Sequence, residues 1–202
     1  SATPAIETYA NCYNGKYNGS KSEKSTSFAP IPAGGYVAKI MGARIENYSW
    51  GSVLIIAFDI YEGEYTGFFQ QRFDNDTSTD KKWKGTFRIT IPDESSEYFS
   101  SQKRSFNNLI YALEVSNGNY TFDWNENGLK GLTLGVLFRN KEWEYKGKTG
   151  WTTECCSVTG ADEIRQGDFK IPKDKPLDNS SGSTVNTNSG SGSDFSNVPL
   201  DD

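Results

Sequence analysis

The sequence predicts a mainly β domain, a small five-stranded barrel with one helix, followed by a flexible tail. Short apolar runs of strand length alternate with turn residues along most of the chain. Only one segment spaces its apolar residues three and four apart, as a helix requires. The last 29 residues are rich in Gly, Ser and Asn. We therefore divide the chain into a polar N-terminal extension (1–29), a folded domain (30–173) and a tail (174–202).

Three strands are predicted before the helix. The segment 52–61 is very apolar, as expected for a central strand. A turn at Glu62-Gly63-Glu64 leads directly into the next predicted strand. The strands predicted in this half are 36–45, 52–61, 65–73 and, within a long polar connection, a further short one at 86–91.

The helix is predicted at 102–115. Its apolar residues Phe106, Leu109, Ile110 and Leu113 fall at i, i+3, i+4 and i+7, and Gly118 lies just beyond its end. The strands predicted after the helix are a short one at 120–124, one at 129–138, and a final hairpin of 143–148 and 150–158.

Three strands, a helix and two or more strands is the order of the OB-fold. This fold is a five-stranded Greek-key barrel with a helix between strands three and four. Its ligands lie across strands two and three and between the loops that follow strands one and four. A β-sandwich remains an alternative, because periodicity does not establish strand order.

Basic and aromatic residues alternate in the segments that an OB-fold would use for binding. Aromatic side chains stack on bases, while Lys and Arg neutralise phosphates, so this pattern indicates single-stranded nucleic acid. The candidate residues are Tyr48, Trp50, Phe69, Arg72, Phe73, Lys81, Lys82, Trp83, Lys84, Arg88, Arg139, Lys141, Trp143, Tyr145, Lys146 and Lys148.

The alternative for each candidate is a tryptophan in the core or a lysine on a solvated face. Trp50 and Trp83 are the strongest candidates, because each has polar neighbours on both sides within a loop. Glu142 and Glu144 flank Trp143 and are expected to offset the cations of that segment.

Composition argues against several other classes of function. The chain has 21 Lys+Arg and 26 Asp+Glu, and the imbalance lies mainly in the tail, so the domain is nearly neutral. It has three cysteines and no histidine, which excludes Ser-His-Asp chemistry and disfavours a zinc site. No Walker loop, membrane-spanning run or signal peptide is visible. We expect a cytoplasmic protein that is not an enzyme and needs no cofactor.

Several stretches resemble single-stranded-DNA-binding proteins of phages and mobile elements in Gram-positive bacteria. The resemblance spans about 30–176, and the stretches that carry it are 30–37, 54–65, 67–69, 107–120, 129–136 and 161–172. It implies an OB-fold, binding of single-stranded DNA with little sequence preference, and a role in replication or recombination.

The tail cannot bury enough apolar surface to offset the entropy of ordering, so it is predicted to be a flexible tether. It ends in an acidic and apolar tip formed by Phe195, Val198, Pro199, Leu200, Asp201 and Asp202. This tip resembles the partner-recruiting end of bacterial single-stranded-DNA-binding proteins, although it lacks their terminal hydrophobic residue. The resemblance implies replication or recombination proteins as partners. A terminus without a role is the alternative, and the sequence leaves homo-oligomer formation open.

Two other functions fit part of the pattern. Exposed aromatic residues also stack on sugars, so a carbohydrate-binding β-module is the main alternative. A carboxylate enzyme is a weaker one, because the spacing of Asp and Glu singles out no pair. Salt dependence separates DNA from sugar, since only phosphates release counterions on binding.

Overall fold

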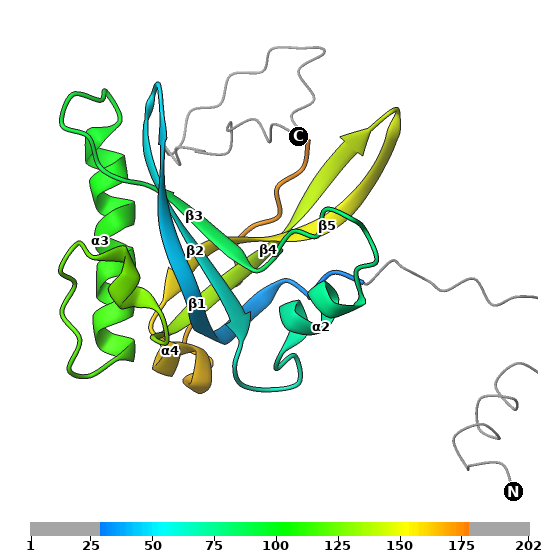
Figure 1. Cartoon of the computed structure of the whole chain (residues 1–202), viewed down its shortest axis with the longest axis horizontal. Coiled ribbons are helices and arrows are strands. Elements are labelled where there is room, and N and C mark those ends of the chain that lie inside the picture. Colours follow the sequence, from blue (N-terminus) through cyan, green and yellow to red (C-terminus); the bar gives the residue numbers. More distant parts are fainter. Residues whose placement is uncertain (1–28, 178–202) are drawn as a thin grey trace, which may run out of the picture.

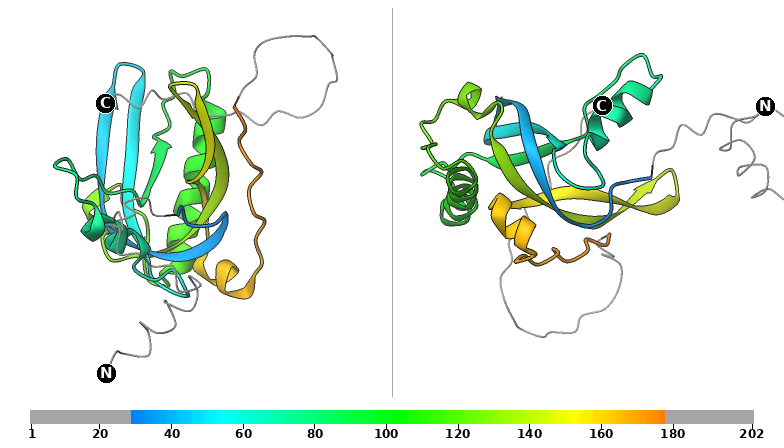
Figure 2. Two further views of the ribbon diagram at one scale, coloured as in Figure 1. Left: turned by 90° about the vertical axis from the view of Figure 1, so that its right-hand side faces the viewer. Right: turned by 90° about the horizontal axis from the view of Figure 1, so that it is seen from below.

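The computed structural model describes residues 29–177 and shows a five-stranded antiparallel sheet with helices around it (Figure 1). The strands lie in the order β3-β2-β1-β4-β5, and the two edge strands, β3 and β5, contact each other (Figure 2). The sheet is therefore curled. The strands are β1 (Gly34–Tyr48), β2 (Gly51–Ile60), β3 (Thr86–Thr90), β4 (Thr133–Tyr145) and β5 (Lys148–Thr159). The helices are α2 (Phe68–Asn75), α3 (Phe99–Ser116), α4 (Ala161–Gln166) and the 3-10 helix η1 (Glu126–Leu129).

The core lies between the sheet and α3. Leu54, Ile56 and Phe58 of β2 point into it, and Leu109 and Leu113 of α3 are fully buried there. The remaining face of β2 is largely buried as well. The predictions of a central strand at 52–61 and a helix at 102–115 are both confirmed. No helix in the part of the chain described here has the length and apolar character to cross a membrane.

A bulge at Met41 determines which residues of β1 face outward. The register with β2 shifts between Ile40 and Gly42, so the inward side of β1 changes from even to odd residues. Ala38 lies in the core before the bulge, and Ala43 packs against the core after it. The even residues at the far end of β1 consequently face away from the core.

The predicted strand at 65–73 is wrong, because Phe68–Asn75 is the helix α2. The carboxylate of Asp59 in β2 accepts hydrogen bonds from the backbone N–H groups of Phe69 (2.9 Å) and Gln70 (3.1 Å). These N–H groups at the start of a helix have no partner within it, so the buried Asp59 stabilises helix over strand. The third strand is instead the short segment at 86–91, observed as β3.

Two further boundaries after α3 differ from the prediction. The segment 120–124 is not a strand: Phe122 and Trp124 turn back onto Phe106 of α3, with the Trp124 ring stacked on it at 5.4 Å. The strands predicted at 129–138 and 143–148 are one strand, β4, which begins at Thr133. It forms the final hairpin with β5, and the turn lies at Lys146-Gly147, where both residues have positive φ. A two-residue turn of this kind matches the twist of paired strands. The short helix α4 was not predicted.

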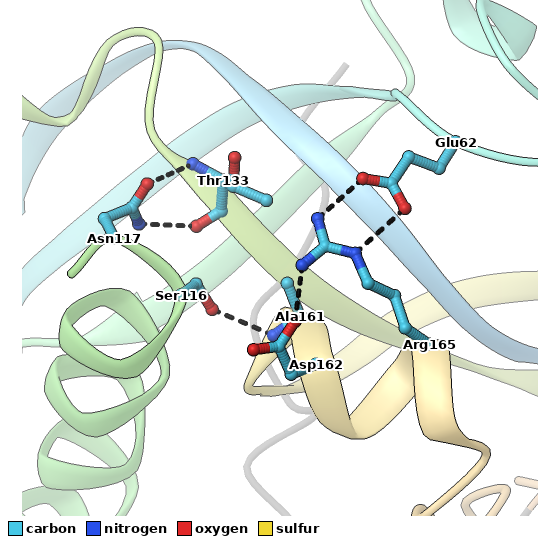
Figure 3. A network of polar contacts seen from close by, with 7 residues as sticks. All are labelled: Glu62, Ser116, Asn117, Thr133, Ala161, Asp162 and Arg165. Atoms are coloured by element: carbon cyan, nitrogen blue, oxygen red, sulfur yellow. Dashed lines mark hydrogen bonds and ion pairs between the residues drawn. The ribbon is translucent and has the colours of Figure 1, made fainter.

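Asn117 joins the end of α3 to the start of β4 (Figure 3). Its side-chain amide donates to the carbonyl oxygens of Leu113 and Thr133, at 2.8 Å each. Its side-chain oxygen accepts from the N–H of Thr133 at 2.9 Å. One side chain thus satisfies three backbone groups at the junction of helix and sheet.

Replacing Asn117 with alanine should lower the free energy of unfolding by about 2 kcal/mol, because partly buried backbone groups lose their partners. Urea unfolding followed by circular dichroism measures this difference. Asn107→Ala is the matched control, since Asn107 is exposed on α3. Equal stability of the two variants would contradict the assigned role of Asn117.

A second network fixes α4 (Figure 3). Arg165 forms a bidentate ion pair with Glu62, with N···O distances of 2.6 and 3.0 Å, and also contacts Asp162. The hydroxyl of Ser116 accepts from the N–H of Ala161 at 2.9 Å. Hydrogen bonding from Arg165 lowers the pKa of Glu62. These contacts join α4 to α3 and to the turn after β2.

The folded part extends beyond the predicted boundary at 173. Lys175 pairs in parallel with Lys141: its N–H donates to the carbonyl of Asn140, and its carbonyl accepts from Glu142, at 2.8 Å each. Backbone pairing of this kind leaves no mark in composition, so the sequence did not show it. The rest of the predicted tail, its tip at 195–202 included, and the extension before residue 29 lie outside the described residues.

Candidate nucleic-acid interface

The turn between β1 and β2 presents a stacked aromatic pair. The rings of Tyr48 and Trp50 are 5.2 Å apart and nearly parallel. Trp50 is 49% exposed and Tyr48 37% exposed. Because the pairing of Tyr48 with Gly51 closes a two-residue turn, the main chain holds Trp50 at the tip of the hairpin. The pair offers a flat apolar surface to solvent.

Two arginines lie beside this pair on the outward face of the sheet. Arg44 of β1 and Arg88 of β3 are both in register with Ile55 of β2, so they flank it on one face. The guanidinium of Arg88 donates to the hydroxyl of Tyr48 at 2.8 Å. We call Arg44, Tyr48, Trp50 and Arg88 the first basic surface.

A single carboxylate joins the residues of the first basic surface. Glu46 accepts hydrogen bonds from Arg44, at 2.8 Å, and from the hydroxyl of Tyr48, and forms an ion pair with Arg88 at 3.5 Å. The hydrogen bonds from Tyr48 and Arg44 lower the pKa of Glu46. The sequence prediction named Tyr48, Trp50 and Arg88 but missed Arg44 and Glu46. The alternation of Arg44, Glu46 and Tyr48 at every second residue was the available signal.

The hairpin of β4 and β5 carries a second group of candidates. Arg139 and Lys141 both bind Glu154 of β5, with shortest N···O distances of 2.7 and 2.9 Å. Trp143 continues the same face, and its indole lies over Gly150, where a Cβ atom would come within 2.7 Å of the ring. We call Arg139, Lys141 and Trp143 the second basic surface. The exposed residues Tyr145, Lys146 and Lys148 lie at the tip of this hairpin.

The acids beside Trp143 lie on the other face of the hairpin. Side chains alternate along a strand, so Glu142 and Glu144 point away from Trp143 and Tyr145. The acid that contacts the cations on the face of Trp143 is instead Glu154, which pairs with Arg139 and Lys141. Glu142 is opposite Trp151, and its carboxylate accepts from the N–H of Leu177 at 3.1 Å.

The candidates of α2 and the following loop form a separate, more enclosed cluster. Phe69 is only 4% exposed, so it is a core residue. The indole N–H of Trp83 is shared between the carbonyl oxygens of Phe58 and Gly85, at 3.0 Å each, and the ring packs against the core. Phe73 lies against Trp83, at 5.9 Å between ring centroids. Arg72 is partly buried on α2, and Lys81, Lys82 and Lys84 are exposed nearby.

The two hairpins extend toward the same end of the molecule and diverge, with β3 between them in two perpendicular views (Figures 1 and 2). The structure thus brings Tyr48, Trp50 and Arg88 into contact, and Arg139, Lys141 and Trp143 onto one face. Trp83 belongs to neither surface and lies in the separate cluster formed by α2 and the loop that follows it. Within 29–177, no group of three or more Cys, Asp and Glu residues could hold a metal ion.

No protein-family model matches this chain, and no curated protein matches it in sequence.

Proposed function

We propose that this protein binds single-stranded DNA with little sequence preference, through an OB-fold-like barrel. The strand order β3-β2-β1-β4-β5, with β3 and β5 in contact, supports a barrel of this type. The position of α3 between β3 and β4 supports it too. The carbohydrate-binding module remains the alternative that a binding experiment has to reject.

The observation that carries the proposal is the first basic surface. It combines an exposed aromatic stack, Tyr48 and Trp50, with two guanidinium groups on the outward face of β1, β2 and β3. A base can stack on the rings while phosphates contact Arg44 and Arg88. The second basic surface would extend the path of the strand along β4 and β5.

The biological role rests on the resemblance in sequence. We propose that the protein protects or organises single-stranded DNA during phage or mobile-element replication or recombination, in the cytoplasm. Its acidic tip at 195–202 would recruit partner proteins. Lys175 pairs with the edge of β4 at Lys141, and Leu177 contacts Glu142 on the opposite face of the hairpin, so the described chain ends at the strand that carries the second basic surface.

A binding titration tests the proposed function. Fluorescence anisotropy would compare a labelled oligo-dT of about 30 nucleotides, longer than the ~4–16 nucleotides that one OB-fold covers, with a duplex of equal length and a neutral glucan oligosaccharide. Tighter binding of the oligo-dT, which weakens between about 50 and about 200 mM salt, is expected. Equal affinity for duplex or no salt response would refute DNA binding of this kind. Glucan binding without salt dependence would favour the carbohydrate module.

Removing one phosphate contact should change the salt dependence as well as the affinity. We expect Arg88→Ala to weaken oligo-dT binding about tenfold and to reduce the slope of log K against log salt by about 0.7. Arg104→Ala is the matched control, because Arg104 is exposed on α3. Identical slopes for Arg88→Ala and the wild type would show that Arg88 does not contact a DNA phosphate.

A further inference from the structure

Glu46 is surrounded by the groups that would bind a phosphate. One of its carboxylate oxygens accepts from Arg44 through both Nε and Nη2, at 2.8 Å each. The other contacts the hydroxyl of Tyr48 and lies 3.5 Å from Arg88. The carboxylate therefore uses both arginines and the tyrosine of the first basic surface at once.

Glu154 stands in the same relation to the second basic surface. One oxygen accepts from Nε and Nη2 of Arg139, at 2.9 and 2.7 Å, and the other lies 2.9 Å from Nζ of Lys141. Burial raises the pKa of Glu154, but the hydrogen bonds from Lys141 and Arg139 outweigh burial and lower it overall. On both surfaces a carboxylate is held between two cations, and each surface also contains a tryptophan, Trp50 or Trp143.

A carboxylate and a phosphodiester present similar pairs of anionic oxygens, and Arg binds both in the same forked geometry. Each surface has two cations. The glutamate that pairs with them reduces the net charge there from +2 to +1. A phosphate that reached these cations would have to displace the glutamate or share its donors. Glu46 holds two cations from two different strands, β1 and β3, and Glu154 of β5 holds two cations of β4.

We propose that Glu46 and Glu154 occupy the positions of two backbone phosphates in the unbound protein and compete with DNA for the same donors. This inference rests on the proposed function and adds a control of its affinity. The glutamates keep the cations in place before DNA arrives. They also lower the affinity for DNA, because binding has to break their ion pairs. They also make binding depend on a strand that offers bases for stacking, because phosphates alone gain little by displacing them.

The test replaces each acid with its neutral isostere. Glu46→Gln and Glu154→Gln should each bind oligo-dT about three- to fivefold more tightly, the range expected for an exposed ion pair. The slope of log K against log salt should steepen by about 0.7 for each, corresponding to one additional phosphate contact. Glu64→Gln is the control, since it makes the same charge change at the other end of β2 in an exposed turn.

Three results would overturn the inference. Weaker or unchanged binding by Glu46→Gln would show that the acid only positions the arginines. Tighter binding without a steeper slope would show that it only screens their charge. An equal gain for Glu64→Gln would show a general effect of net charge.

A failure of the proposed function can be told apart from a failure of this inference. If the wild-type protein does not bind oligo-dT, inorganic polyphosphate replaces it as the probe. Tighter polyphosphate binding by Glu46→Gln would then support the competing carboxylate while rejecting DNA as the ligand. Unchanged polyphosphate binding would reject both.

Discussion

Replacing Trp50 with alanine is expected to weaken oligo-dT binding by about 1–3 kcal/mol, the value of one stack between a base and an aromatic ring. This corresponds to an increase in Kd of roughly 5- to 150-fold. The free energy of unfolding should change by less than about 0.5 kcal/mol, because the indole is half exposed in a turn. Trp50 therefore contributes to binding far more than to stability.

Two variants serve as controls for Trp50→Ala. Trp50→Phe keeps an aromatic face and should retain most of the affinity. Trp124→Ala removes a tryptophan that is 63% exposed but stacks on Phe106 of α3 and does not belong to the first basic surface. Oligo-dT titration and urea unfolding of all three variants measure both effects. An affinity loss for Trp124→Ala equal to that for Trp50→Ala would place the interface elsewhere.

Replacing Trp83 with alanine is expected to lower the free energy of unfolding by about 2–3 kcal/mol, somewhat less than the ~3–5 kcal/mol for a fully buried tryptophan. Its ring packs against the core, and its N–H joins Phe58 of β2 to Gly85, the residue before β3. Under conditions where the variant is folded, its affinity for oligo-dT should match the wild type. Trp83 thus contributes to stability and not to binding, whereas Trp50 contributes to binding and little to stability.

Trp83→Phe separates the two contributions of this side chain. It keeps most of the packing and loses the hydrogen bond, so it should cost about 1 kcal/mol. Thermal and urea unfolding measure the loss in each variant. The prediction would be contradicted if the Trp83→Ala protein were as stable as the wild type but bound oligo-dT more weakly. Trp83 would then be part of the binding surface.

Local patterns were sufficient for the helix and the central strands. The spacing of Phe106, Leu109 and Leu113 depends on one helix packing on one core, and the apolar run of β2 depends on burial of both its faces. The segment 65–73 was read wrongly because its helix depends on a distant group, the carboxylate of Asp59. A sequence window around α2 does not contain that contact.

The candidate site depended still more on contacts between strands. Tyr48 and Trp50 were found because a loop with polar neighbours indicates exposure. Arg44 was missed because it lies within the first strand, outside the segments that an OB-fold would use for binding. Trp83 also has polar neighbours, yet the indole folds back to backbone carbonyls of β2 and of the residue preceding β3.

Photo-crosslinking tests most directly whether single-stranded DNA lies on the outward face of β1, β2 and β3. The protein would be irradiated with an oligo-dT that carries photoreactive uridines, and the linked residues would be identified by mass spectrometry. Crosslinks are expected at Tyr48 or Trp50, with further ones at Trp143. Crosslinks confined to Trp124 and Tyr111, beside and on α3, would contradict it.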